Sequence, residues 1–245
     1  MPYMMGGFPD PETSIRIANA YADSGADLIE LGVPYSDPLA DGPVIHEAAT
    51  SALAAGVRFE DVLEACRAVS GRLPVVLMAY TNMVLGSQGP AAFAERSLAA
   101  GACGVIVPDL PLGEDEPTRD LLNSAGLSVV PLIAPTTPEK RQTEICRLAA
   151  GFVYVVSTVG TTGERNELPA ELQGLVAGVS AEADVPVAVG FGIGTAEQAA
   201  EVGRISDGVI IGSKLVRLVA DADGGDQAVA AVSRFLEQTR RAMGG

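Results

Sequence analysis

The 245-residue sequence predicts an α/β fold, a (β/α)₈ or TIM barrel formed by a single domain. Eight short apolar segments recur along the chain, and stretches with helical spacing separate them. Glycine follows most of the helical stretches at once, as it commonly does at helix ends. The length suits one barrel, which takes about 250 residues, and no linker or shift in composition divides residues 1–245.

The apolar segments are continuous runs of Val, Ile and Leu, as expected for parallel strands that are covered on both faces. The predicted strands are Pro2–Met5, Asp27–Leu31, Val75–Tyr80, Gly104–Pro108, Ser128–Ile133, Phe152–Val156, Val187–Gly190 and Gly208–Ile211. Eight strands close a barrel whose interior is filled by side chains.

Between the strands, apolar residues recur at spacings of three and four, as Ile15, Ala18 and Ala22 do in the first helix. The predicted helices are Pro11–Ser24, Phe59–Ser70, Pro90–Ala100, Glu114–Ser124, Pro138–Ala149, Thr195–Val202 and Gln227–Ala242. Two further helices are expected, one starting near His46 and one containing Lys214 after the last strand.

A doubly wound open sheet is the main alternative architecture. It usually carries a GxGxxG turn after its first strand, and the segment Met5–Pro9 does not supply one. In the barrel interpretation one feature is unusual. Residues before the first strand often plug the barrel floor, but here that strand begins almost at Met1, so an N-terminal plug helix is short or missing.

Composition and charge restrict the possible partners. The formal net charge is −15, which argues against nucleic acid or an anionic membrane surface. No apolar run approaches the roughly 20 residues of a membrane span, and the first residues lack the basic head of a secretory signal. A cytoplasmic location is therefore expected.

The sequence shows little sign of a metal site or of a catalytic nucleophile. Cys66, Cys103 and Cys146 form no CxxC pair and are predicted to be buried small side chains. His46 is the only histidine, so neither a multi-histidine metal site nor a His-based triad can form. Lys214 could form a Schiff base, but its place in a helix favours a surface position or a position next to a phosphate.

Functional groups of such barrels lie at the carboxyl ends of the strands. Glu30 lies between Ile29 and Leu31 in the second strand and is expected to point into the barrel. Desolvation there would raise its pKa toward neutrality, which suits a group that both donates and accepts a proton. A Glu in a polar layer without a catalytic role is an equally good interpretation of this residue alone.

Asp109 follows the apolar run of the fourth strand, between Pro108 and Leu110. A fixed carboxylate there could accept a substrate N–H and stabilise a developing positive charge. The alternative is an Asp that caps the helix near Glu114, although Asp109 lies several residues early for that role.

The last three strands end in glycine-rich segments, which predict a phosphate site. These segments are Ser157–Gly163, Gly190–Gly194 and Gly208–Ser213. Glycine lets backbone N–H groups approach a phosphate closely, and a helix N-terminus favours the negative charge. The polar loop Thr158–Pro169 is a candidate mobile lid, or else a plain surface loop.

The run from Glu30 to Pro43, ELGVPYSDPLADGP, resembles the signature of the tryptophan synthase α subunit family. The resemblance continues, in the family's order, through Met78–Asn82, Pro108–Pro111, Ser157–Gly163, Gly190–Ile193 and Gly212–Ser213. It therefore covers nearly the whole chain.

The resemblance implies a lyase that cleaves indole-3-glycerol phosphate to indole and glyceraldehyde 3-phosphate in tryptophan biosynthesis. It implies that Glu30 is the general acid and base, that Asp109 accepts the indole N–H, and that Asp41 helps to align the site. The remaining matches are Tyr3, Tyr80, Tyr154 and Phe191 around the indole, and Gly163, Gly192, Gly212 and Ser213 around the phosphate.

The family also implies no metal and no cofactor in this chain, because pyridoxal phosphate belongs to a β subunit that pairs with it in an α2β2 assembly. Two alternatives stay open at this point. The chain could release indole without a partner, or it could be a catalytically weak barrel that mainly activates a β subunit.

Overall fold

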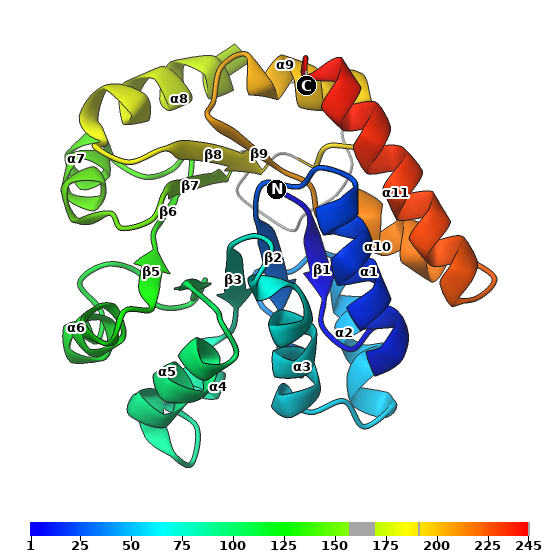
Figure 1. The fold of residues 1–245 in the computed structure, drawn as a ribbon. Helices are drawn as coiled ribbons and strands as arrows, with labels where there is room; N and C mark the ends of the chain where they lie inside the picture. The colour runs from blue at the N-terminus through cyan, green and yellow to red at the C-terminus, as the bar shows by residue number, and fades with distance from the viewer. Residues whose placement is uncertain (157–169, 191, 245) are drawn as a thin grey trace.

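Parallel strands form the centre of the structure, a computed structural model that describes residues 1–156, 170–190 and 192–244 (Figure 1). Hydrogen bonds join these strands in the orders β1-β2-β3-β4-β5 and β6-β7-β8-β9. The strands are β1 (Tyr3–Met5), β2 (Ile29–Gly32), β3 (Val75–Met78), β4 (Gly104–Ile106), β5 (Ser128–Val130), β6 (Leu132–Ile133), β7 (Val153–Val156), β8 (Val187–Gly190) and β9 (Gly208–Ile210).

The two groups of strands join at both ends into one barrel. On one side β5 and β6 are parts of a single segment divided at Pro131, which has no N–H for the ladder but accepts a bond from Tyr154 N at 2.9 Å. On the other side Pro2 pairs with Ile211, and Tyr3 N donates to the Ile211 carbonyl at 2.8 Å. The predicted barrel is confirmed, with its fifth strand in two parts.

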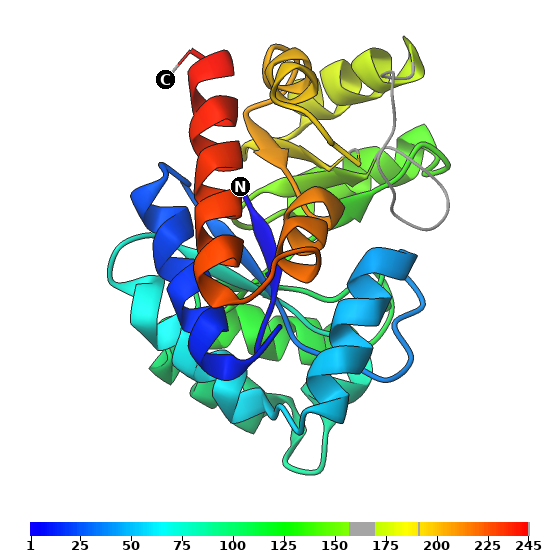
Figure 2. The ribbon, with the colours of Figure 1, turned by 90° about the vertical axis from the view of Figure 1, so that its right-hand side faces the viewer.

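Helices cover the outside of the barrel (Figures 1 and 2). Their bounds are α1 (Pro11–Asp23), α2 (Pro43–Ala54), α3 (Phe59–Ser70), α4 (Thr81–Leu85), α5 (Gly89–Ala99), α6 (Glu116–Ala125), α7 (Glu139–Leu148), α8 (Ala170–Glu182), α9 (Ala196–Gly203), α10 (Ser213–Ala220) and α11 (Gly225–Ala242). Figure 2 shows α11 beside α1, so the last helix packs against the first. Within the described residues, none of these helices combines the length and the apolar character needed to cross a membrane.

Two helices, α4 and α8, were not predicted from the sequence. The short α4 lies within the loop that follows β3. In α8 the stripe of Leu172, Leu175, Val176 and Val179 is masked by small apolar residues on the other faces, and Gly174 and Gly178 interrupt the helix. The helical period therefore gives little signal there.

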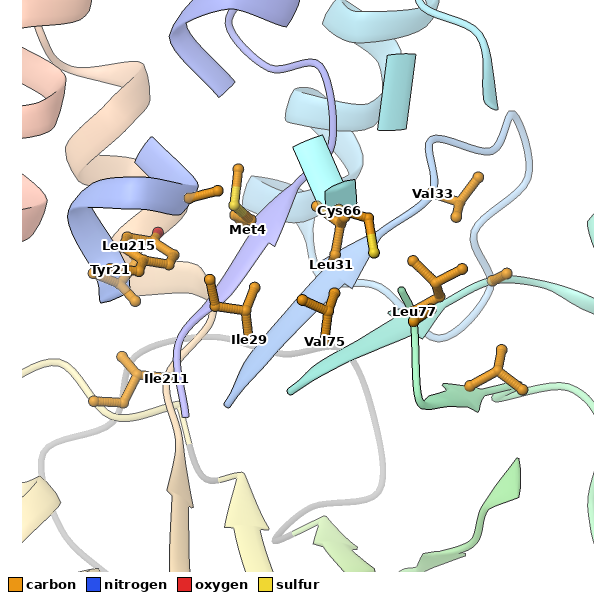
Figure 3. Close-up of a cluster of buried hydrophobic side chains, with 14 of the residues drawn as sticks. Met4, Tyr21, Ile29, Leu31, Val33, Cys66, Val75, Leu77, Ile211 and Leu215 are labelled. Carbon is orange, nitrogen blue, oxygen red and sulfur yellow. The ribbon is translucent and has the colours of Figure 1, made fainter. Parts of the chain in front are cut away.

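The two faces of the strands bury different side chains. One face packs against the helices, as Figure 3 shows for Ile29, Leu31, Val75 and Leu77. The other face fills the barrel with a separate cluster that includes Val76. Side chains alternate along a strand, so a residue between two outward-facing neighbours points inward.

The cysteine prediction is right for two residues and wrong for the third. Cys66 and Cys146 are buried, but Cys103 is exposed. Cys103 lies in the turn that precedes β4, and its thiol is 3.4 Å from the Val75 carbonyl oxygen. The apolar run used to predict its burial begins only after it.

Candidate active site

Glu30 is a buried carboxylic acid on the inner face of the barrel. It lies between Ile29 and Leu31 on β2, and its register partners are Tyr3 on β1 and Val76 on β3. Only 3% of its surface is exposed, and its Oε2 atom has no hydrogen-bond partner among the described residues. Burial, together with the negative charge of Asp41, raises its pKa to about 8. The predicted inward position and raised pKa are confirmed, and the acid is protonated at neutral pH.

Asp41 is the second buried carboxyl group of this site. It lies in the loop between β2 and α2, where its N–H donates to the Pro38 carbonyl at 3.0 Å. Burial raises its pKa to about 6, and a hydrogen bond from the Tyr80 hydroxyl and the nearby charge of His46 oppose that rise. Asp41 is therefore mainly ionised at neutral pH, next to an acid that is mainly neutral.

Tyr80 connects the loop that carries Asp41 to the end of β3. Its hydroxyl accepts a hydrogen bond from Ala40 N at 3.1 Å and donates one to the Asp41 carboxylate. Its ring stacks on Tyr35 with 5.1 Å between the ring centroids, and Asn82 Nδ2 donates to the Tyr35 hydroxyl at 2.6 Å. These contacts hold the polar loop over the carboxyl end of the barrel.

Asp109 forms hydrogen bonds with the residue that follows Tyr80. Asp109 is exposed, and its Oδ1 atom accepts hydrogen bonds from Thr81 N at 2.8 Å and from Thr81 Oγ1 at 2.9 Å. Asp109 thus caps α4, a helix that the sequence did not reveal, while Asp115 caps α6. The role beside the indole nitrogen that the family resemblance implied for Asp109 stays a prediction.

Tyr3 and Tyr154 project into the barrel near the two carboxyl groups. Burial and the negative charges of Asp41 and Glu30 raise the pKa of both phenols well above the ordinary value. Their hydroxyl groups lie against two strand glycines. A Cβ atom at Gly32 would be 2.2 Å from Tyr3 Oη, and one at Gly190 would be 2.5 Å from Tyr154 Oη. These phenols remain neutral hydrogen-bond donors.

The N-terminus of α10 is a candidate anion site among the described residues. Gly212 is its N-cap and the buried Ser213 its first residue, and no side chain caps this end. The N-terminus of α9, by contrast, is closed by Thr195 and Gln198. Free N–H groups and the helix dipole both favour an anion at α10.

The other predicted phosphate-site and pocket residues lie partly within and partly outside the described residues. Gly192 lies in the loop after β8 with φ of +57°, a conformation that favours glycine. Gly163, Phe191 and the candidate lid at 158–169 lie outside the described residues. Lys214 is half-buried, with Nζ 6.0 Å from the centroid of the Phe235 ring on α11, which gives it a packing role.

The described residues contain no group of three or more His, Cys, Asp or Glu side chains that could hold a metal ion. What they offer is a pair of buried carboxyl groups with different protonation states, neutral phenol donors and an open helix N-terminus. This combination suits acid–base chemistry on a small phosphorylated substrate. Sequence reasoning undervalued Asp41, although its loop, rich in polar residues directly after Glu30, carried the signal.

Comparisons with known proteins point to one family. The family model described as "Tryptophan synthase alpha chain" matches residues 1–243. A tryptophan synthase alpha chain of Synechococcus sp. is 44% identical over 99% of this chain and 90% of its own length. That of Carboxydothermus hydrogenoformans is 47% identical over 89% of this chain and 82% of its own.

Solved structures give the same result. A structure of Mycobacterium tuberculosis tryptophan synthase superposes with a TM-score of 0.89 at 36% identity, covering 99% of this chain and 91% of the other. The crystal structure of tryptophan synthase subunit alpha from Legionella pneumophila gives the same four values.

Proposed function

Because the chain belongs to the tryptophan synthase alpha chain family, we propose that Glu30 and Asp41 are the carboxyl groups with which it cleaves indole-3-glycerol phosphate. The reaction of the family is the retro-aldol cleavage of this substrate to indole and glyceraldehyde 3-phosphate. The observation that carries the proposal is the buried pair of a neutral Glu30 and an ionised Asp41 at the carboxyl end of β2.

Cleavage needs a proton at indole C3 and a base for the hydroxyl group on the adjacent glycerol carbon. Glu30, with a pKa of about 8, donates its proton to C3. The carboxylate so formed then takes the proton of the hydroxyl group while the C–C bond breaks and the aldehyde forms. Glu30 ends the cycle protonated again, so one group serves both steps.

Asp41 is the group that accepts the indole N–H in this proposal. Protonation at C3 leaves positive charge on the indole nitrogen, which a nearby carboxylate stabilises. Asp41 is ionised, buried and close enough to Glu30 to raise its pKa, whereas Asp109 is exposed and accepts its hydrogen bonds from Thr81. We therefore transfer to Asp41 the role that the family resemblance had implied for Asp109.

The phosphate group binds at the N-terminus of α10 in this proposal, through Gly212 and Ser213 and with Gly192 alongside. The phenols of Tyr3 and Tyr154 line the indole pocket together with Tyr80. Gly163 and Phe191 remain predictions for the phosphate and indole sites. Together these contacts place C3 of the substrate against Glu30.

Tryptophan synthase alpha chains work in a complex with a beta subunit, which carries pyridoxal phosphate, whereas the alpha chain uses no cofactor. We propose an α2β2 assembly, a cytoplasmic location and a single barrel domain over residues 1–245 for this chain. The indole released at Glu30 would pass to the beta subunit.

The test is a coupled assay of glyceraldehyde 3-phosphate release from indole-3-glycerol phosphate, with and without a beta subunit. We expect the wild-type chain to be active, Glu30→Gln to lose activity at least about 1,000-fold with little change in substrate affinity, and Asp41→Asn to lose about 100-fold. Activity that needs no beta subunit would favour the partner-independent lyase. If indole release is absent even with a beta subunit, the chain is the catalytically weak activator instead.

A further inference from the structure

We propose that Asp109 is a positioning residue, which fixes Thr81 and thereby holds the Tyr80 hydroxyl that orients Asp41. This inference deepens the function proposed above and rests on the role given there to Asp41. Its direct support is the pair of hydrogen bonds that Asp109 Oδ1 accepts from Thr81, at 2.8 Å from the backbone N–H and 2.9 Å from the hydroxyl.

The connection from Asp109 to Asp41 passes through residues adjacent in sequence. Thr81 is the first residue of α4, and Tyr80 directly precedes it as the N-cap. The carboxylate of Asp109 therefore fixes the backbone from which the Tyr80 side chain projects. The Tyr80 hydroxyl in turn accepts from Ala40 N at 3.1 Å and donates to Asp41.

The loop that carries Asp109 is itself anchored, as a positioning role requires. The buried Arg119 on α6 donates from Nη2 to the Leu110 carbonyl at 2.9 Å, and Arg141 on α7 donates to the Leu112 carbonyl. A cavity of about 310 Å³ separates this loop from parts of α7. The hydrogen bonds from two helices and the burial of Leu110 in the core together set the place of the loop.

The groups that act on Asp41 come from several elements of the barrel. A change at Tyr80 alone therefore tests what its hydrogen bond contributes to the pKa of Asp41. Glu30 on β2, Tyr3 on β1, Tyr154 on β7 and His46 on α2 all interact with it electrostatically. Tyr80 is the one whose hydrogen bond lowers the pKa of Asp41. Loosening Tyr80 therefore raises the pKa of Asp41 and leaves the other groups in place.

The test compares Asp109→Ala with wild type in two measurements. Carboxyl ¹³C NMR of the ligand-free protein should show the Asp41 titration moved up by about one pH unit, because a hydrogen bond to the charged form is weakened. In the coupled assay kcat should fall about 10-fold with little change in KM, and the acidic limb of the pH profile should move in the same direction.

The control is Asp10→Ala, which removes a 2.8 Å cap bond of the same kind, to Thr13 N on α1, away from Tyr80. This variant should move neither the titration nor the pH profile. In a Tyr80→Phe background, which by itself should raise the pKa of Asp41, Asp109→Ala should add no further shift.

Asp109→Asn distinguishes positioning from direct catalysis, because the amide oxygen can still accept both bonds from Thr81. We expect it to restore most of the kcat lost in Asp109→Ala. An equally severe loss in both variants with an unmoved Asp41 titration would overturn the proposal. The NMR result is independent of substrate turnover, so failure of the proposed function would appear separately, as an inactive wild type with the Asp41 shift still present.

Discussion

A carboxylic acid inside a barrel keeps its proton unless solvent or a cation stabilises the charged form. Glu30 is almost fully buried, no described residue donates a hydrogen bond to its Oε2, and the ionised Asp41 next to it makes ionisation harder still. Asp41 differs because it receives a hydrogen bond from Tyr80. Two carboxyl groups in one site thus hold different protonation states, and acid–base catalysis depends on that difference.

This environment makes the stability of the protein depend on pH in a defined direction. The folded-state pKa of Glu30 is raised from 4.5 to about 8, so the unfolded chain ionises first as the pH rises. The resulting loss of stability grows between pH 4.5 and 8 and is absent below that window. Glu30→Gln should therefore raise the free energy of unfolding by roughly a few kcal/mol at pH 8 and by almost nothing at pH 4.5. Urea unfolding at both pH values checks this, and an equal gain at both would contradict it.

At the scale of secondary structure, the strands and helices fix the positions of the polar groups of the site. The parallel register puts Tyr3 beside Glu30 and Met5 beside Gly32, and the missing side chain of Gly32 leaves the space that the Tyr3 hydroxyl occupies. The loop from β2 to α2 and the cap of α4 then bring Asp41 to the same end of the barrel. A site residue can thus depend on a glycine that makes no contact with substrate.

Gly32→Ala should destabilise the fold by roughly 1–3 kcal/mol, because its Cβ would lie 2.2 Å from Tyr3 Oη. Tyr3→Phe in the same chain should recover part of that loss, since the atom in closest contact is removed. Gly71→Ala is the matched control, because a Cβ there meets nothing within 4 Å and φ is −74°. Denaturant unfolding of the three variants measures the effect, and the prediction fails if Gly32→Ala is as stable as Gly71→Ala.

Gly212→Ala tests the proposed phosphate site at the N-terminus of α10. A Cβ at Gly212 would lie 3.7 Å from Ile45 and Tyr3, an ordinary contact, so the fold should tolerate it. It would, however, stand between the first N–H groups of α10 and a phosphate. We expect inhibition by inorganic phosphate to weaken about 10-fold, with unfolding unchanged. Unaltered phosphate inhibition would place the phosphate elsewhere.

At the scale of the whole molecule, closure of the barrel brings segments that are distant in sequence together in one site. Strand β1 joins the end of β9 through Tyr3 and Ile211, so residues near both ends of the chain lie side by side. Because the described strands pair in parallel, their carboxyl ends share one rim, and the segments that carry Glu30, Tyr80 and Gly212 all belong to that end of the barrel. A net charge of −15 leaves backbone N–H groups as the main means of binding a phosphate.

The sequence by itself determined the barrel, most of its helices, the inward position of Glu30 and the family. These properties follow from local patterns: continuous apolar runs, helical spacing, glycine stops and a long motif. The missed helices had weak patterns, α4 because it is short and α8 because small apolar residues and glycines surround its apolar stripe.

Only the tertiary structure shows how different the surroundings of Asp41 and Asp109 are. Both follow a strand in sequence, and sequence position alone does not show which of the two is buried. The difference is in burial and hydrogen bonding, because Asp41 turns toward Glu30 under Tyr80 whereas Asp109 stays exposed and caps α4. Burial and pairing depend on the three-dimensional neighbours of a residue, which sequence position alone does not specify.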